Sequence, residues 1–504
     1  MKSRTLTPII ATTLFAVLAI PVPLAAQHTR YKLIDIDTLG GPAAIGQVDG
    51  TGISQFINNP GVVVGGADTS IPDPNAPGCG DCFLVHAFRW QNDVLTDLGA
   101  LPGVNFSHAT SINARGWATG GSFTAGIDPL TGGPTEHAVL WKDGEIIDIG
   151  TLLPGVESAG LYVNNGGEVV GFSTVDTTPD PFASIGLSPF ASHTHAFVWK
   201  NGVTRDLGTL GGPDSFASGG CNNERIELVA GASFTSSTPN PSGFPTLDPF
   251  LWKDGTMIDL GGLGGTFGFA QCANNRGHVI GQSNLAEDVD QHAFLWEQET
   301  MKDLGTLGGS FSVAIWLNNA GEAVGGADTT GDESFHATLW RNGQITDLGT
   351  LDGDCASRAL AINSKSQIIG QSFNCDTNTL RAVLWDKGAI IDLNAAIPPN
   401  SSLQLVEPFN INDRGEIVGR GLPAGCDNGD ACGHIFLLIP CNHAGAQNCE
   451  DSADFTPRTN PASISTRATT QTQRHHTTKE FVAQWRARLS QRYHIHGVRA
   501  SPRD

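Results

Sequence analysis

The chain has 504 residues and a formal net charge of −21 at pH 7, with 29 Lys and Arg against 50 Asp and Glu. Such an acidic balance argues against nucleic acid or an anionic membrane as the main partner. Sixty-two glycines beside three methionines and three tyrosines favour many short strands joined by tight turns, because glycine weakens helix interiors by about 1 kcal/mol relative to alanine.

The first 26 residues have the features of an export signal. Lys2 and Arg4 precede an apolar, uncharged run over 8–24, and cleavage is expected after Ala26. A membrane anchor is the alternative, but two prolines interrupt the run, which is short for the roughly 20 residues that cross a bilayer. We expect no membrane span and a mature bacterial protein that is secreted or periplasmic.

A motif of the form HAFLW recurs along the chain, with a degenerate last copy, HIFLL, at residue 434. Its tryptophans recur every 44 to 58 residues and are Trp90, Trp141, Trp199, Trp252, Trp296, Trp340 and Trp385. This period is close to that of a four-stranded propeller blade, with a solenoid as the competing repeat architecture.

Each repeat holds four strand signals. In one copy these are FGFAQCANN (267–275), HVIGQS (278–283), HAFLW (292–296) and MKDLG (301–305). An Asn-x-x-Gly pattern joins the first two strands, and it suits a short hairpin because Asn caps its own turn while Gly adopts a positive φ.

The two ends of the repeat region decide between the two architectures. Residues 31–37 form a fourth strand that no HAFLW precedes, whereas 434–440 form a third strand that no DLG follows. Each end supplies what the other lacks. We therefore predict an all-β, eight-bladed β-propeller of four-stranded blades, in which the N-terminal strand completes the last blade.

The repeat, HAF-x-W followed by DLGTLGG and an IN-x-x-G-x-V-x-G hairpin, closely resembles the HAF family of bacterial extracellular repeat proteins, with an order of elements similar to that of WD-repeat propellers. The resemblance covers roughly residues 31–440. It implies export and a repeat scaffold. It implies no established reaction, and it transfers no catalytic residue.

The motif histidines and the aspartates that follow them could be read as metal ligands. A single site does not require a copy in nearly every blade, however, so we interpret these residues as structural. We expect them to form hydrogen bonds within or between blades, since buried polar groups are costly when unpaired. Asp248 and Arg381 replace the histidine in two copies while the repeat persists. The histidines are His86, His137, His195, His292, His336 and His434, and the aspartates are Asp97, Asp148, Asp206, Asp259, Asp303, Asp347 and Asp392.

Functional residues are expected where the repeats differ, in the connections between the second and third strands. These loops vary from about eight to about twenty residues, as in 284–291 and 174–195, and they share one face with the GTLGG turns. Two acidic groups there are candidate binding residues, with Ca²⁺ as the one cofactor considered and solvated loop charge as the alternative. They are Glu287, Asp288 and Asp290 in one loop and Asp328, Asp332 and Glu333 in the next.

Ten cysteines in an exported chain favour disulfides over metal ligands. Cys355 and Cys375 lie at the same end of one hairpin, and we expect them to pair. The other candidate pairs are Cys426–Cys432, Cys441–Cys449, Cys79–Cys82 and Cys221–Cys272.

The expected organisation is a signal peptide (1–26), a propeller (27–441) and a Ser/Thr/Arg-rich linker and tail (442–504). A short helix is predicted near 479–493, where four apolar residues share one face. The rest of the tail is predicted to be disordered.

Two functions follow from these observations. The first is a monomeric, non-catalytic binding or scaffold protein that recognises a glycan, a protein or a surface component through the variable loops. The second is an extracellular hydrolase or lyase acting on a polysaccharide at the channel mouth. A non-repeated pair of carboxylates or histidines would favour the second. His108 and His193 depart from the repeat, but nothing in the sequence unites them.

Overall fold

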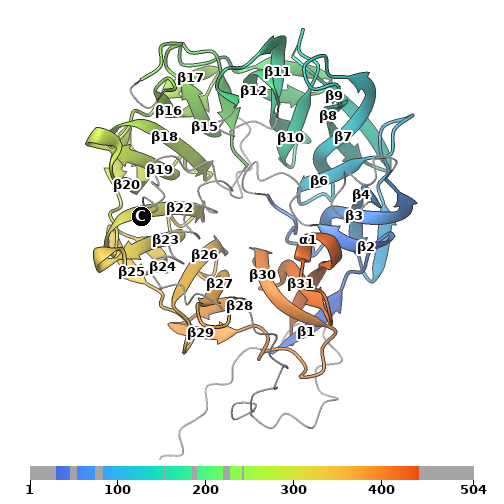
Figure 1. Cartoon of the computed structure of the whole chain (residues 1–504), viewed down its shortest axis with the longest axis vertical. Helices are drawn as coiled ribbons and strands as arrows, with labels where there is room; N and C mark the ends of the chain where they lie inside the picture. The colour runs from blue at the N-terminus through green and yellow to red at the C-terminus, as the bar shows by residue number, and fades with distance from the viewer. Residues whose placement is uncertain are drawn as a thin grey trace, which may run out of the picture.

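The structure is a computed structural model (Figure 1), and it describes residues 30–45, 54–73, 83–152, 154–183, 190–219, 228–240 and 243–441. The predicted export signal and the predicted linker, tail and helix lie outside the described residues. So do Cys79, Cys82, Cys221 and Cys449.

The described chain is all-β, as predicted, and its strands form repeated antiparallel sets of four. Figure 1 shows these sets arranged around a common centre, with the first strand of a set nearest to it, as for β10, β26 and β30. The first three sets are separate sheets in chain order: β2 (Gly40–Ile45), β3 (Val63–Pro72), β4 (Phe83–Gln91) and β5 (Val94–Asp97); β6 (Ser107–Ile112), β7 (Ala118–Ile127), β8 (Pro134–Lys142) and β9 (Glu145–Gly150); β10 (Ser158–Val163), β11 (Val169–Pro179), β12 (Ser192–Lys200) and β13 (Val203–Asp206).

The middle of the chain forms one twelve-stranded sheet made of three such sets. Single parallel pairings, Leu247 with Phe267 and Gln291 with Phe311, join neighbouring sets. The strands are β14 (Ser215–Ala217), β15 (Leu228–Phe234), β16 (Leu247–Lys253) and β17 (Thr256–Asp259); β18 (Gly264–Ala273), β19 (Val279–Leu285), β20 (Gln291–Glu297) and β21 (Thr300–Asp303); β22 (Gly308–Leu317), β23 (Ala323–Thr329), β24 (Phe335–Arg341) and β25 (Gln344–Asp347).

The two ends of the repeat region share the last sheet. β1 (Tyr31–Asp35) pairs antiparallel with β32 (His434–Pro440), Tyr31 opposite Pro440 and Asp35 opposite Phe436. This confirms the predicted pairing of residues 31–37 with the last third strand, although the observed strand ends at Asp35. The remaining strands of the final two sheets are β26 (Ala356–Ile362), β27 (Ile368–Asn374), β28 (Thr379–Asp386) and β29 (Ala389–Asp392), and then β30 (Leu403–Ile411) and β31 (Ile417–Pro423) beside β32.

The Asn turns hold successive sets together at the ends of their first strands. The side-chain oxygen of Asn318 accepts hydrogen bonds from the amides of Ala320 and Glu322, and its amide group donates to the carbonyl of Asn363 in the next set. Gly321 takes φ +90°, which L side chains rarely adopt. The same donation runs from Asn412 to the carbonyl of Asn58 at 3.0 Å, and it therefore links the last set to the first.

The motif tryptophans pack between sets. Trp141 belongs to the same buried cluster as Val62 and Val64 of the preceding set. Trp90 of the first set lies in a cluster with Val418 and Leu437 of the last one. Burying so large a side chain contributes roughly 1.5–3 kcal/mol, and each tryptophan thus stabilises a junction as well as its own sheet.

Two predicted disulfides are confirmed. Cys355 pairs with Cys375, with Cα atoms 5.9 Å apart, and Cys426 pairs with Cys432 at 5.8 Å. Cys272 and Cys441 are also disulfide-bonded, while their proposed partners lie outside the described residues. Among the described residues, no helix has the length and apolar character needed to cross a membrane.

Antiparallel connectivity defines two faces. Turns between first and second strands, and between third and fourth strands, lie on one side, which we call the Asn-turn face. Loops between second and third strands, and the DLG turns leading to the next set, lie on the other side, which we call the variable-loop face.

Candidate functional site

The structure places each motif histidine beside the aspartate of its own set. Nδ1 of the histidine lies 2.9–3.0 Å from a carboxylate oxygen in every described pair. The same carboxylates accept an amide hydrogen bond two residues further on, as Asp97 does from Gly99 at 2.7 Å. These side chains stabilise the blade. The pairs are His86–Asp97, His137–Asp148, His195–Asp206, His292–Asp303, His336–Asp347 and His434–Asp35.

The two copies without histidine show what that residue does. Burial, with Asp259 nearby, raises the pKa of Asp248 to about 6, because two carboxylates now occupy the place of the His–Asp pair. Arg381 instead lies 2.6 Å from Asp354 and 3.6 Å from Asp392, so a cation is retained.

Five of the six acidic residues proposed for binding lie in loops on the variable-loop face, and the sixth, Asp328, lies on β23. Two of the loop residues are bonded to the first strand of their own set. Asp288 accepts a hydrogen bond from the amide of Thr266 at 2.6 Å, and Asp332 accepts one from the amide of Ser310 at 2.7 Å. Asp328 is fully buried. Within the described residues, the six do not come together as a group of potential metal ligands. Glu287 and Glu333 are exposed, and Asp290 is partly exposed.

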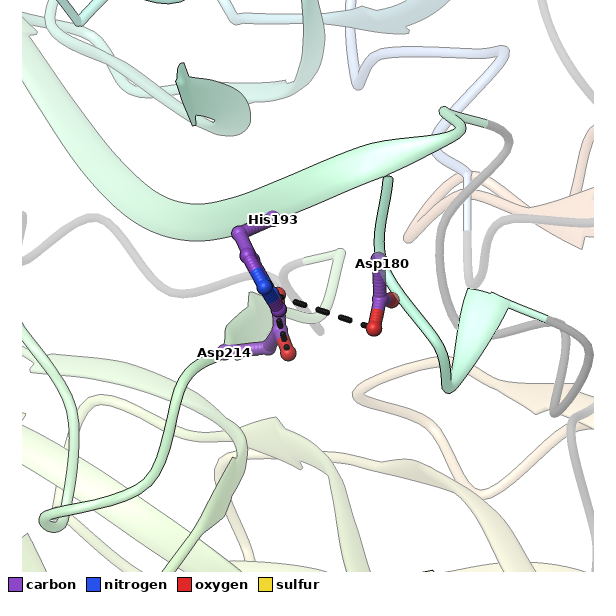
Figure 2. A group of neighbouring side chains, drawn as sticks. All are labelled: Asp180, His193 and Asp214. Atoms are coloured by element: carbon purple, nitrogen blue, oxygen red, sulfur yellow. Dashed lines mark hydrogen bonds and ion pairs between the residues drawn. The ribbon is translucent and has the colours of Figure 1, made fainter. Parts of the chain in front are cut away.

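A different group meets at the junction of two sets. Asp180 directly follows β11, His193 is the second residue of β12, and Asp214 directly precedes β14 of the next set. Figure 2 shows the three side chains pointing toward one another. Nδ1 of His193 lies 3.2 Å from Oδ1 of Asp214 and 3.8 Å from Oδ1 of Asp180. One ligand atom from each residue lies within 4.8 Å of the other two.

The group is largely buried, which shapes its electrostatics. The side chains of Asp214, Asp180 and His193 are 0%, 5% and 19% exposed. Burial raises the pKa of Asp214 to about 6 against the lowering effect of the Thr194 amide, which donates to it at 2.7 Å, and Asp180 adds to the rise. Burial also raises the pKa of Asp180, against the hydrogen bond from the Phe182 amide.

The preceding junction has two carboxyl groups at the equivalent positions but no histidine. Asp128 directly follows β7, and Glu157 directly precedes β10. Burial and the neighbouring Asp128 raise the pKa of Glu157 to about 8. The pKa of Asp128 is lowered: burial opposes this, but Glu157 and two backbone amides outweigh it. The pair therefore shares a proton near neutral pH, with Thr135 standing where His193 stands in the next set.

His108 and His193, which the sequence singled out as departing from the repeat, are not united. His108 is buried on β6, where its Nε2 lies 3.8 Å from Oε1 of Glu136. His193 belongs to the group of Figure 2. Sequence reasoning singled out His193 but missed Asp180 and Asp214. The sequence does carry a pattern that points to them. At two successive junctions, one acidic residue follows the second strand of a set and another precedes the first strand of the next set.

A cavity of about 200 Å³ opens among the Asn turns, and its lining includes Asn58, Asn113, Asn318 and Trp316. The sequence placed function on the variable-loop face. The cavity is therefore a further feature that sequence reasoning missed, and it exists because turns from several sets meet around the centre.

Comparisons with known proteins give only distant structural likenesses. No family model matches the chain, and no curated protein does. Similar solved structures include a puromycin-hydrolyzing peptidase of Mycobacterium tuberculosis (11% identity, TM-score 0.39, covering 77% of this chain and 62% of that one) and an acylaminoacyl peptidase of Pyrococcus horikoshii (11%, 0.41, 76% and 60%). Another is the β-propeller domain of the Trilobed protease of Pyrococcus furiosus (8%, 0.40, 69% and 99%).

The chain spans about three fifths of the two peptidases. All three TM-scores are below 0.5. The activities of those proteins are therefore not transferred to this chain, and its function is argued from its own residues.

Proposed function

We propose that this chain is an exported, eight-bladed HAF-repeat propeller that binds a glycan, a protein or a surface component through its variable-loop face. The observation that supports this proposal most directly is that the repeated histidines and aspartates are paired with each other. Each described motif histidine is paired with an aspartate of its own set, so the repeated side chains that could act as acids or bases already serve the scaffold. Side chains that differ between sets remain for recognition, and they concentrate on the variable-loop face.

The architecture supports a binding role in a second way. The junctions are held together by Asn turns and tryptophans, which leaves the loops between second and third strands free to differ. A rigid scaffold that presents unequal loops is a common basis for recognition, because the loops change without cost to the core.

The binding proposal is tested with the purified chain on a glycan array, alongside a variant in which two exposed loop acids are reversed in charge, Glu287→Lys with Glu333→Lys. The matched control is Glu299→Lys, an exposed acid in the turn between β20 and β21 on the Asn-turn face. Binding that the double variant loses and the control keeps is the expected result. Equal binding by all three proteins would contradict recognition by this face.

A second function is favoured by one observation, the non-repeated group Asp180, His193 and Asp214. A histidine beside two buried carboxylates is a constellation that hydrolases and lyases use for acid–base or metal-assisted chemistry. A polysaccharide-degradation screen with the wild-type chain and His193→Gln separates the two functions. Product release that the variant abolishes would replace the binding proposal with an enzymatic one.

A further inference from the structure

We propose that Asp180, His193 and Asp214 bind a divalent transition-metal ion, of the Zn²⁺ or Mn²⁺ type, through one imidazole nitrogen and two carboxylate oxygens. The inference goes beyond the proposed function, because it depends on three side chains and not on the identity of any glycan or protein partner.

The spacing of the three ligand atoms fits a coordination sphere. Ligands about 2.1 Å from an ion stand roughly 3.4 Å apart in a tetrahedral arrangement and about 4.2 Å apart when opposite each other. Nδ1 of His193 lies 3.2 Å and 3.8 Å from the two carboxylates, and no pair of ligand atoms exceeds 4.8 Å. The two separations from His193 are therefore close to those of ligands on one ion.

Three separate segments of the chain position the ligand atoms, and two of the three side chains are held in place by backbone hydrogen bonds. The amide of Phe182 donates to Asp180 at 2.7 Å, and the amide of Thr194 donates to Asp214 at 2.7 Å, so both carboxylates are oriented by backbone. Metal-bound carboxylates are commonly fixed by such outer hydrogen bonds.

The two carboxylates of the group carry negative charge that a bound cation would compensate. A proton on Nδ1 of His193 can bond to Asp214, but 3.8 Å is too long for a hydrogen bond to Asp180. Two nearly buried carboxylates therefore face one imidazole. Buried charges need compensation, and a divalent cation bound to all three groups would neutralise both carboxylates.

The neighbouring junction shows the contrast within the same molecule. Asp128 and Glu157 occupy the positions of Asp180 and Asp214, with Thr135 in place of His193, and there the two carboxyl groups share a proton. The third set differs by supplying a nitrogen ligand. Mixed nitrogen and oxygen ligands suit Zn²⁺ or Mn²⁺, whereas Ca²⁺ takes six to eight oxygens.

Such an ion would join the loop between β11 and β12 to the start of the next set. His193 is 19% exposed, so the site is reachable from solvent. Three protein ligands leave at least one position for water or for a ligand atom, which would place a Lewis acid on the variable-loop face.

The test is metal titration of the full mature chain after treatment with a chelator. Co²⁺ is followed by visible absorption, and Zn²⁺ and Mn²⁺ are followed by calorimetry. The variants are His193→Gln and Asp180→Asn, with two matched controls. His195→Gln removes a motif histidine on the same strand, and Glu157→Gln changes the equivalent junction. Circular dichroism and melting temperature verify folding of each protein.

The tail contains His475-His476, a second source of imidazole ligands, so the deciding quantity is the difference between wild type and variant. We expect the wild type to bind one more ion per chain than His193→Gln and Asp180→Asn do, and both controls to match the wild type. Absence of that difference in folded proteins would overturn the proposal. Should one variant fail to fold, the other decides. No glycan or protein ligand is present, so failure here leaves the binding proposal standing.

Discussion

At the scale of single residues, the interaction between two side chains eleven residues apart depends on whether the first of them is histidine or aspartate. His292 with Asp303 forms a bond of 2.9 Å, whereas Asp248 with Asp259 brings two carboxylates together and raises the pKa of Asp248. Most of these pairs are partly exposed, so each contributes modestly, on the order of 0.2–1 kcal/mol. Their importance lies in repetition around the molecule.

Asp248→His should therefore stabilise the protein at pH 7. The raised pKa of Asp248 means that its charge is unfavourable in the folded state above pH 6, and a histidine would replace repulsion with the pair found in other sets. We expect a gain of roughly 1–2 kcal/mol, measured by denaturant unfolding. The reverse change, His292→Asp, is the control and should destabilise. A neutral or negative effect of Asp248→His would contradict the role given to this pair.

Glu157 predicts a pH dependence of stability. Its folded pKa of about 8 lies above its ordinary value of 4.5, so the folded state keeps a proton that the unfolded state has lost. Stability should consequently fall as the pH rises from about 4.5 to about 8, by at most about 1.4 kcal/mol per pH unit. The lowered pKa of Asp128 acts on the acid side, below its ordinary value of 3.8.

Glu157→Gln removes the titrating group. The melting temperature of this variant relative to wild type should rise between pH 5 and pH 9, whereas the exposed Glu299→Gln should show no such trend. A difference that stays constant with pH would contradict a shared proton at this junction.

At the scale of elements, a serine on the first strand of one set holds the preceding set in place. Ser312 on β22 is fully buried. Its hydroxyl accepts a hydrogen bond from the amide of Ala293 at 2.8 Å and donates to the carbonyl of Gly305 at 2.7 Å. The same two bonds recur at Ser107, Ser158, Ser215 and Ser357.

Ser312→Ala should destabilise the protein by roughly 1–3 kcal/mol, because it leaves the buried amide of Ala293 and the partly buried carbonyl of Gly305 without partners. Denaturant unfolding measures the loss. Ser402→Ala, at an exposed position between β29 and β30, is the control and should change little. A loss below about 0.5 kcal/mol for Ser312→Ala would contradict this account of the junction.

At the scale of the whole molecule, the first and last parts of the repeat region depend on each other. β1 pairs along β32, His434 bonds to Asp35 at 3.0 Å, and Asn412 donates to the carbonyl of Asn58. Without β1, the outer edge of β32 would present unpaired backbone groups, which promote association with other chains.

Deletion of residues 27–36 should therefore lower the melting temperature and produce oligomers, detected by calorimetry and light scattering. Deletion of residues 451–504 controls for shortening of the chain and should leave both measurements unchanged. A monomer of unaltered stability after removal of β1 would show that the last sheet does not need its fourth strand.

The sequence by itself determined the repeated hairpins, the pairing of the N-terminal strand (predicted over 31–37) with 434–440, and the disulfides Cys355–Cys375 and Cys426–Cys432. These features follow from local turn chemistry and from the order of strands within one period. The tertiary structure decided which side chains meet across a junction. Asp180, His193 and Asp214 come together only because two neighbouring sets face each other at a particular rotation, and no local pattern encodes that rotation. Among the described residues, the acidic residues of 287–290 and 328–333 likewise do not come together as a group of potential metal ligands.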